Sequence, residues 1–175
     1  MANREALREL QSRLATRLQA ARTEGMSVAW LAVKAADANF LLPLGQSGEI
    51  FPLVSLQPVP YAQVWFKGVL NIRGGLFGVV DLIGFIRSGQ SPKREAVSPD
   101  ACVVTLNPLL DVNCALQVDS LAGLRGADAF VSSCAAPEGS PTYFGHQFED
   151  KDGVTWQEID LRTLSQTPQF LSISA

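Results

Sequence analysis

The chain has 175 residues and a mass of 18.8 kDa, enough for one compact domain with an appendage but not for two full-sized cores. Its hydrophobic content of 47% and charged content of 18% exclude a disordered chain, and no apolar run approaches the ~20 residues of a membrane-spanning helix. The net charge of -3 argues against nucleic acid as the main ligand, because such proteins need a dense basic surface.

Residues 1–25 are predicted to form an amphipathic helix that ends at Gly25. Its apolar stripe lies among Arg and Glu residues and consists of Leu7, Leu10, Leu14, Leu18 and Ala21. An isolated helix of this length is marginal in water, so the stripe must bury against the chain's own domain or against a partner, and the sequence leaves both open. The segment lacks the apolar stretch of a secretory signal, so we expect a cytoplasmic protein.

After Gly25 the pattern changes to short strand-like runs separated by Gly, Pro, Asn and Asp, and residues 26–166 are predicted to form one domain with a C-terminal tail at 167–175. The segment 88–100 is polar and contains two prolines, which predicts a crossover loop. Eight short strands indicate an all-β sandwich or barrel. The candidate strands are Val28–Val33, Phe40–Leu44, Val69–Ile72, Leu76–Val80, Cys102–Leu106, Cys114–Val118, Tyr143–Phe148 and Val154–Ile159.

The two halves of this domain repeat one pattern, in which an aromatic pair precedes a hairpin that ends in Asp-Leu. Trp65 is followed sixteen residues later by Asp81, and Tyr143 is followed seventeen residues later by Asp160. We interpret both aspartates as N-caps of short helices, at 82–87 and 161–165, rather than as catalytic groups. The repeat supports two related small barrels.

The sequence offers little material for catalysis, a cofactor or a metal. His146 is the sole histidine, so no nucleophile–base arrangement can be argued, and the chain has no phosphate-binding loop. The three cysteines lie in apolar surroundings and are predicted to be buried free thiols: Cys102, Cys114 and Cys134. A domain of this composition without catalytic groups is typical of a binding module. Three tryptophans leave a ligand-binding barrel as an alternative, although core packing explains them more simply: Trp30, Trp65 and Trp156.

The densest local signal is the segment Trp65–Leu82, in which two apolar strands flank Asn71-Ile72-Arg73-Gly74-Gly75. Gly74 and Gly75 are expected to supply the positive φ angles of a tight reversal. Arg73 would then be held at the turn, where its guanidinium can bind a carboxylate or carbonyl of a partner. An ion pair within the domain that pins the hairpin explains Arg73 equally well.

This segment resembles the signature of the CheW family, a Gly-Val-x-Asn-(Leu/Ile)-Arg-Gly strand and turn followed by an apolar strand ending in Asp-Leu. The resemblance extends over about Val28 to Leu164, and the family often has proline where this chain has Gly78. The second half matches less well, at His146-Gln147 and the acidic turn that follows. The matching positions are Gly68, Val69, Asn71, Ile72, Arg73, Gly74, Val79, Val80, Asp81 and Leu82.

The resemblance implies an all-β fold of two small intertwined five-stranded β-barrels, to which this chain adds the N-terminal helix and a short helix after each hairpin. It also implies a non-enzymatic adaptor that links the cytoplasmic tip of a methyl-accepting chemoreceptor to the regulatory domain of a CheA-type histidine kinase at receptor arrays on the inner membrane. The N-terminal helix, residues 59–63 and the tail make the chain look most like the family's type IV pilus members, which implies a PilJ-type receptor and twitching motility. An ordinary flagellar chemotaxis coupling protein is the alternative. The partner-binding residues implied are Glu49, Ile50, Gly68, Asn71, Arg73 and Gly74.

Overall fold

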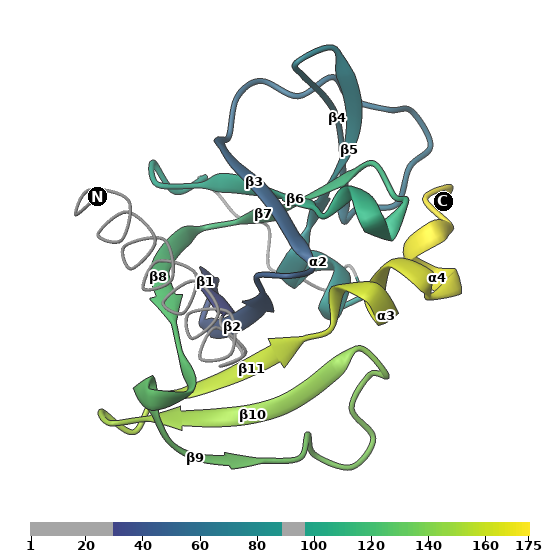
Figure 1. Ribbon diagram of the computed structural model, residues 1–175. Helices are drawn as coiled ribbons and strands as arrows, with labels where there is room; N and C mark the ends of the chain where they lie inside the picture. Colours follow the sequence, from purple (N-terminus) through teal and green to yellow (C-terminus); the bar gives the residue numbers. More distant parts are fainter. Residues whose placement is uncertain (1–29, 89–96) are drawn as a thin grey trace, which may run out of the picture.

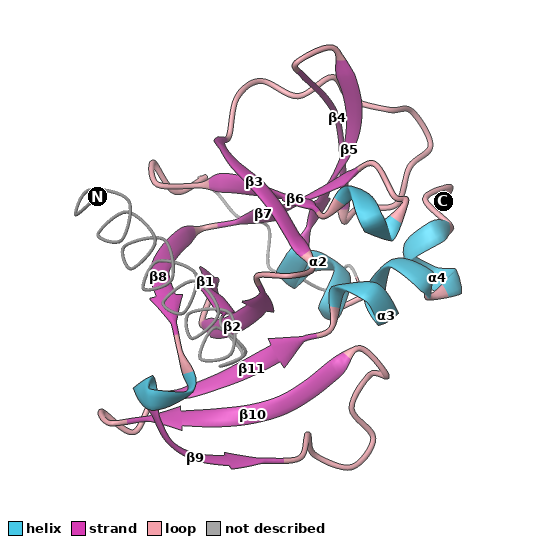
Figure 2. Ribbon diagram, viewed as in Figure 1, coloured by secondary structure: helices cyan, strands magenta, loops and turns pink. Residues whose placement is uncertain are grey.

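The computed structural model describes residues 30–88 and 97–175, which form two β-sheets joined by short helices (Figure 1). The predicted N-terminal helix and most of the predicted crossover loop lie outside the described residues. Figure 2 shows α2, α3 and α4 gathered where the two sheets meet. No helix of the described part is long and apolar enough to cross a membrane. The elements are β1 (Trp30–Ala35), β2 (Ala38–Pro43), β3 (Ser47–Pro52), β4 (Phe66–Ile72), β5 (Gly75–Asp81), α2 (Leu82–Ile86), β6 (Cys102–Leu106), η1 (Pro108–Leu110), β7 (Cys114–Val118), β8 (Ser120–Arg125), η2 (Ala127–Ala129), β9 (Phe130–Cys134), β10 (Phe144–Asp150), β11 (Thr155–Ile159), α3 (Leu161–Gln166) and α4 (Pro168–Leu171).

The chain starts one sheet, builds the other, and then returns to complete the first. The six-stranded sheet has the order β8-β1-β2-β11-β10-β9, and the five-stranded sheet has the order β3-β6-β7-β5-β4. Pairing is antiparallel except between β2 and β11 and between β5 and β7. The two repeated hairpins fall one in each sheet, β4–β5 in the smaller and β10–β11 in the larger.

Within residues 30–88 and 97–175, a strand is present at each of the eight predicted places, and three further strands were missed. The missed strands are β3, β8 and β9, and each lies at the edge of a sheet. Their side chains are mostly exposed or half-buried, so their sequences lack the apolar runs that marked the other strands. Hydrophobic patterning detects strands that are buried on at least one face, and edge strands need no such pattern.

The prediction of two five-stranded barrels is wrong in detail, because the sheets have six and five strands and neither closes by a continuous ladder. In each sheet, side chains from both edge strands nevertheless belong to or pack against one hydrophobic cluster. In the larger sheet, Ala122 of β8 and Phe130 of β9 pack on the same cluster. In the smaller sheet, Phe51 of β3 packs against the cluster that contains Leu70 of β4. Each cluster therefore links the two edges of its sheet through intervening side chains, although no backbone ladder joins those edges.

The repeated aspartates both sit at a helix N-terminus, but only one acts as the predicted cap. Asp160 accepts a hydrogen bond from the backbone N–H of Thr163 at 2.8 Å, which confirms its capping of α3. The Asp81 side chain makes no capping hydrogen bond to α2. Its Oδ2 instead lies 3.9 Å from Nζ of Lys67. The capping prediction for Asp81 is therefore wrong, although the helix begins where expected.

The main core lies between the sheets and includes the apolar faces of α2, α3 and α4. Trp65 sits at this junction, with its ring centroid 5.0 Å from that of Phe85 in an edge-to-face contact and 6.5 Å from that of Phe170. Trp30 and Trp156 belong to a second cluster inside the curl of the larger sheet. All three tryptophans are 3% exposed, which favours the core-packing interpretation over a ligand-pocket wall.

Candidate functional site

The tip of the β4–β5 hairpin forms a two-residue turn, and Arg73 occupies its first position. Ile72 pairs with Gly75, which leaves Arg73 and Gly74 as the loop, with φ angles of 49° and 85°. Two successive positive φ angles are typical of a type I′ turn, whose twist matches that of the flanking strands. The sequence predicted Gly74 and Gly75 in this role, so the structure corrects the position by one residue. Asn71 supports the turn, because its Oδ1 accepts a hydrogen bond from the Gly74 N–H at 3.0 Å.

Arg73 reaches across the open side of the smaller sheet and binds Glu49 on β3. Its two terminal nitrogens lie 2.9 and 2.8 Å from the two carboxylate oxygens, a bidentate ion pair. The guanidinium also lies 5.6 Å from the centroid of the Phe51 ring. The contact joins the hairpin to the opposite edge strand, as expected for the intradomain interpretation of Arg73. The two side chains remain 72% and 58% exposed, so they are also accessible to a partner.

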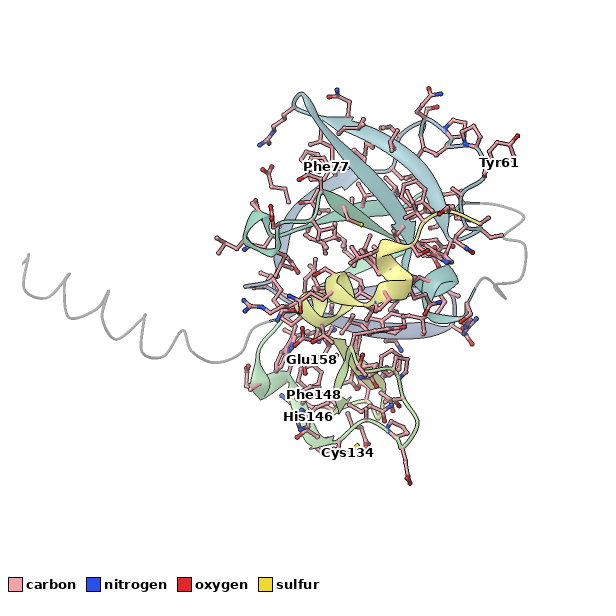
Figure 3. All side chains as sticks on the ribbon, turned by 90° about the vertical axis from the view of Figure 1, so that its right-hand side faces the viewer. Tyr61, Phe77, Cys134, His146, Phe148 and Glu158 are labelled. Atoms are coloured by element: carbon pink, nitrogen blue, oxygen red, sulfur yellow. The ribbon has the colours of Figure 1, made fainter. Side chains whose placement is uncertain are left out.

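A cavity of about 320 Å³ adjoins this ion pair. Its walls include Glu49 and Phe51 from β3, Arg73 from the turn, Phe77 from β5 and Thr105 from β6. Figure 3 shows Phe77 on the part of the molecule that contains the hairpin. The cavity has one charged pair on a largely apolar wall, which suits an apolar side chain of a partner flanked by a polar group.

Thr105 fixes the backbone that carries Glu49. The Glu49 N–H donates to Thr105 Oγ1 at 2.8 Å, and the same hydroxyl donates to the Glu49 carbonyl at 3.2 Å. The register of β3 against β6 shifts between Ser47 and Ile50, which leaves room for this side-chain bridge. A Cβ at Gly48 would collide with Thr105 Oγ1, so glycine is required there. Sequence reasoning missed Thr105 and Phe51, and Gly48 beside Glu49 was the available signal.

Two residues implied by the resemblance do not join this cluster. Gly68 has a φ of 134°, and a Cβ there would collide with the carbonyl oxygen of Gln57. Gln57 and Val69 exchange two backbone hydrogen bonds of 3.0 and 2.8 Å beside it, so Gly68 allows the approach of another chain segment. Ile50 lies on β3 opposite Val104 and is 43% exposed, and it does not line the cavity. The structure therefore brings together Glu49, Asn71, Arg73 and Gly74.

His146, the single candidate general base, is an exposed residue of the mostly half-buried strand β10 (Figure 3). The neighbouring Glu158 is already engaged, because its Oε1 accepts from Trp30 Nε1 at 2.8 Å and its Oε2 accepts from the His146 backbone N–H at 3.2 Å. Glu158 therefore ties β11 to β1 and β10. Within residues 30–88 and 97–175, no cluster of three His, Cys, Asp or Glu side chains could hold a metal ion.

The cysteines differ in their surroundings. Cys102 and Cys114 are buried as predicted, and burial raises the pKa of the Cys114 thiol to about 12 and raises that of Cys102 as well. Cys134 is exposed, so the prediction of three buried thiols is wrong for it. The reason is its place on β9, which is an edge strand with little apolar cover.

Comparison with known proteins agrees with this architecture. A family model described as the CheW-like domain matches residues 29–168. Protein PilI of Pseudomonas aeruginosa is 27% identical over 164 residues, which cover 93% of this chain and 89% of that protein. The crystal structure of the scaffolding protein TtCheW from Thermoanaerobacter tengcongensis superposes with a TM-score of 0.64 at 18% identity, over 82% of this chain and 95% of that one. The resemblance inferred from the hairpin motif is thereby confirmed, and it extends well beyond that motif.

Proposed function

The chain belongs to the CheW-like domain family, and from that premise we propose that it is a non-catalytic adaptor that couples a methyl-accepting chemoreceptor to a CheA-type histidine kinase. Its working place would be the cytoplasmic side of receptor arrays at the inner membrane. Such a protein acts by holding two partners at once, so its output is their geometry and local concentration. No bond is made or broken in this role.

The observation that carries this proposal is the exposed Arg73–Glu49 pair beside a mainly apolar cavity. A guanidinium presents five N–H donors, and the bidentate contact with Glu49 leaves others for acceptors of a partner. We propose that Glu49, Ile50, Asn71, Arg73 and Gly74 contact the receptor tip or the kinase regulatory domain. Gly68 would act indirectly, because its contact with Gln57 sets the path of β4. Each interface is expected to be small, at or below ~1,200 Å², as suits contacts that cooperate in an array.

We further propose that the chain serves a type IV pilus system that controls twitching motility, with a PilJ-type receptor as its partner. The likeness to protein PilI supports this assignment, because it spans 93% of the chain and so includes more than the shared domain. A flagellar chemotaxis coupling role is the second candidate. Its support is the fold shared with the scaffolding protein TtCheW.

Reconstitution with purified partners tests the adaptor role. Receptor cytoplasmic fragments are sedimented in the presence of the kinase, with and without this chain, and the kinase in the pellet is measured. We expect the kinase to pellet with the receptor only when the chain is present, and Arg73→Glu to reduce that fraction by about tenfold. The matched control is Arg87→Glu, because Arg87 forms an ion pair with Asp37 away from the hairpin. Equal recovery of kinase without the chain would refute the proposal.

A deletion strain separates the two biological settings. We expect loss of twitching with normal swimming, restored by the full chain supplied in trans. Loss of directed swimming with normal twitching would replace the pilus assignment with the flagellar one while leaving the adaptor role intact.

A further inference from the structure

Two rows of apolar side chains cross the larger sheet and end on its edge strand β8. Residues paired across neighbouring strands point to the same face of a sheet, here the face that carries the main core. Read from β2 through β1 to β8, the rows are Leu42, Leu31 and Leu124, and Phe40, Val33 and Leu121. Their members on β2 and β1 are at most 4% exposed, whereas Leu124 is 68% and Leu121 is 42% exposed. Among the described residues, the layer that covers this face therefore stops short of β8.

The shape of this uncovered part suits one helix. β8 lies beside β1 at the edge of the larger sheet (Figure 1). Apolar side chains on a sheet face are normally covered by a second layer, and a helix about 10 Å wide covers an edge strand and its neighbour. β8 has six residues and is therefore about 20 Å long. A helix of about 14 residues has the same length.

The chain before Trp30 carries an apolar stripe of this length. In the predicted helix, Leu7 and Ala21 are fourteen positions apart, or about 21 Å. At about 100° per residue, two arginines flank each side of the stripe, and Glu5 and Glu9 lie on the opposite side. Glu24, in the last turn, is the one acidic residue beside the stripe. The flanking arginines are Arg4 and Arg22 on one side and Arg13 and Arg17 on the other.

The larger sheet has the charge opposite to that of these basic margins. Residues 30–43 and 119–159, which contain this sheet, include three basic and eight acidic residues, a net charge of -5. The other described residues include four basic and five acidic residues, a net charge of -1. Residues 1–29 include five arginines and three glutamates, a net charge of +2. Asp119 and Asp128 lie just beyond the two ends of β8, so two of the acidic residues bracket the uncovered leucines.

We propose that residues 1–25 form a helix that packs on β8 of the same chain, with the leucine stripe over Leu121 and Leu124. This contact would continue both apolar rows into a second layer and place the arginines against an acidic surface. It would answer the question that the sequence left open, whether the stripe buries against the chain's own domain or against a partner.

The connection to β1 allows this packing. Trp30 pairs with Arg125, so the chain enters β1 next to Leu124. Residues 26–29 can span about 17 Å between Gly25 and Trp30. That reach lets a helix lie over β8 and turn back into β1.

This connection is also the reason to prefer residues 1–25 over a separate apolar partner. A tethered segment has an effective concentration on the order of millimolar at a nearby site. A separate protein, or the same segment of a second copy, competes at its much lower free concentration. The Arg73–Glu49 pair lies on the smaller sheet, so a helix on β8 leaves that pair exposed. The docked helix therefore does not depend on the proposed coupling role.

The labelling rate of an introduced thiol in the full chain tests the proposal. Exposed Cys134 is first replaced by serine, and Leu124→Cys then places a thiol under the proposed helix. The matched control is Val131→Cys, because Val131 is 62% exposed on β9, at the other edge of the same sheet. We expect a thiol reagent to modify the Leu124→Cys protein about tenfold more slowly than the Val131→Cys protein.

Variants in the N-terminal segment identify what protects the thiol. Leu14→Asp should restore fast labelling of the Leu124→Cys protein, because it places a charge in the middle of the stripe. Ser12→Asp adds the same charge on the opposite side of the predicted helix and should leave the protection intact. Circular dichroism and an unchanged labelling rate of the Val131→Cys protein confirm that each variant is folded.

Three outcomes would overturn the proposal. Equal labelling rates of the Leu124→Cys and Val131→Cys proteins would show that β8 stays uncovered. Protection that increases with protein concentration between about 1 and 100 µM would assign the contact to the helix of a second copy. Loss of protection on adding phosphatidylglycerol vesicles, with the chain sedimenting with them, would assign the stripe to a lipid surface.

Discussion

Reversing the charge of Arg73 separates its structural role from its proposed role in binding. Arg73→Glu removes the bidentate pair with Glu49 and places two carboxylates face to face. The double variant Glu49→Arg/Arg73→Glu restores the pair with its charges exchanged. A structural role requires only that opposite charges meet. A partner, in contrast, would meet the wrong charge at both positions of the double variant.

The expected loss of stability is small because both side chains are more than half exposed. Exposed ion pairs contribute ~0.2–1 kcal/mol, and like charges at the same distance cost a similar amount. The sum of about 0.5–2 kcal/mol corresponds to a lowering of Tm by roughly 1–8 °C in a protein of this size. Calorimetry at low salt measures this shift, and 1 M NaCl should abolish most of it because the Debye length falls to ~3 Å.

Binding should respond differently from stability. We expect Arg73→Glu to lower Tm slightly and to weaken receptor or kinase binding at least tenfold, and the double variant to recover Tm but not binding. Isothermal calorimetry with the purified partners measures the second effect. If the double variant recovers binding together with Tm, Arg73 only pins the hairpin. A fall in Tm above 10 °C for the single variant would contradict the energetic argument itself.

Four further outcomes test the fold. Gly68→Ala should lower Tm by at least 5 °C, because the added Cβ meets the Gln57 carbonyl at a φ reserved for glycine, and an unchanged Tm would disprove the close approach. Asp160→Ala should cost about 1 kcal/mol in urea unfolding through the lost cap of α3, and no change in the midpoint would contradict it. In the native protein a thiol reagent at pH 8 should label Cys134 rapidly and leave Cys114 unmodified. Because burial raises the pKa of Cys114 to about 12 from an unfolded value of 9.0, its contribution to stability is complete below pH 9 and is lost as the pH rises towards 12, which unfolding at a series of alkaline pH values would detect.

The sequence predicted the interior strands because their burial requires an apolar pattern. β6 and β7 are fully buried along their length, and their predicted bounds match the structure to the residue. β3 and β9 lie at sheet edges, where exposure removes that requirement. The number of strands in each sheet depends on these edge strands. Hydrophobic patterning did not detect them, so it could not show that the predicted five-stranded barrels were wrong.

The resemblance implied six site residues, of which the structure brings four together, but it did not predict how they are arranged. The motif around Arg73 indicated an exposed turn, and Glu49 was implied by the resemblance. The ion pair between Arg73 and Glu49 joins the hairpin tip to the edge strand β3. It depends on the curvature of the smaller sheet, which short-range sequence patterns do not record. The hydrogen bonds between Thr105 and the Glu49 backbone were missed for the same reason, since the two residues are 56 positions apart in the chain. Gly68 was implied as a partner-binding residue, and the structure shows a steric reason for glycine there.

The pairing of β2 with β11 has a consequence for synthesis on the ribosome. Phe40 pairs with Gln157, which is 117 residues later in the chain. At a translation rate of ~5–20 residues per second, about 6–23 s pass between the synthesis of β2 and the synthesis of β11, the strand that pairs with it. Throughout that interval one edge of β2 is an open template for foreign strands. Newly made chains should therefore depend on a holding chaperone more than the modest size of the protein suggests.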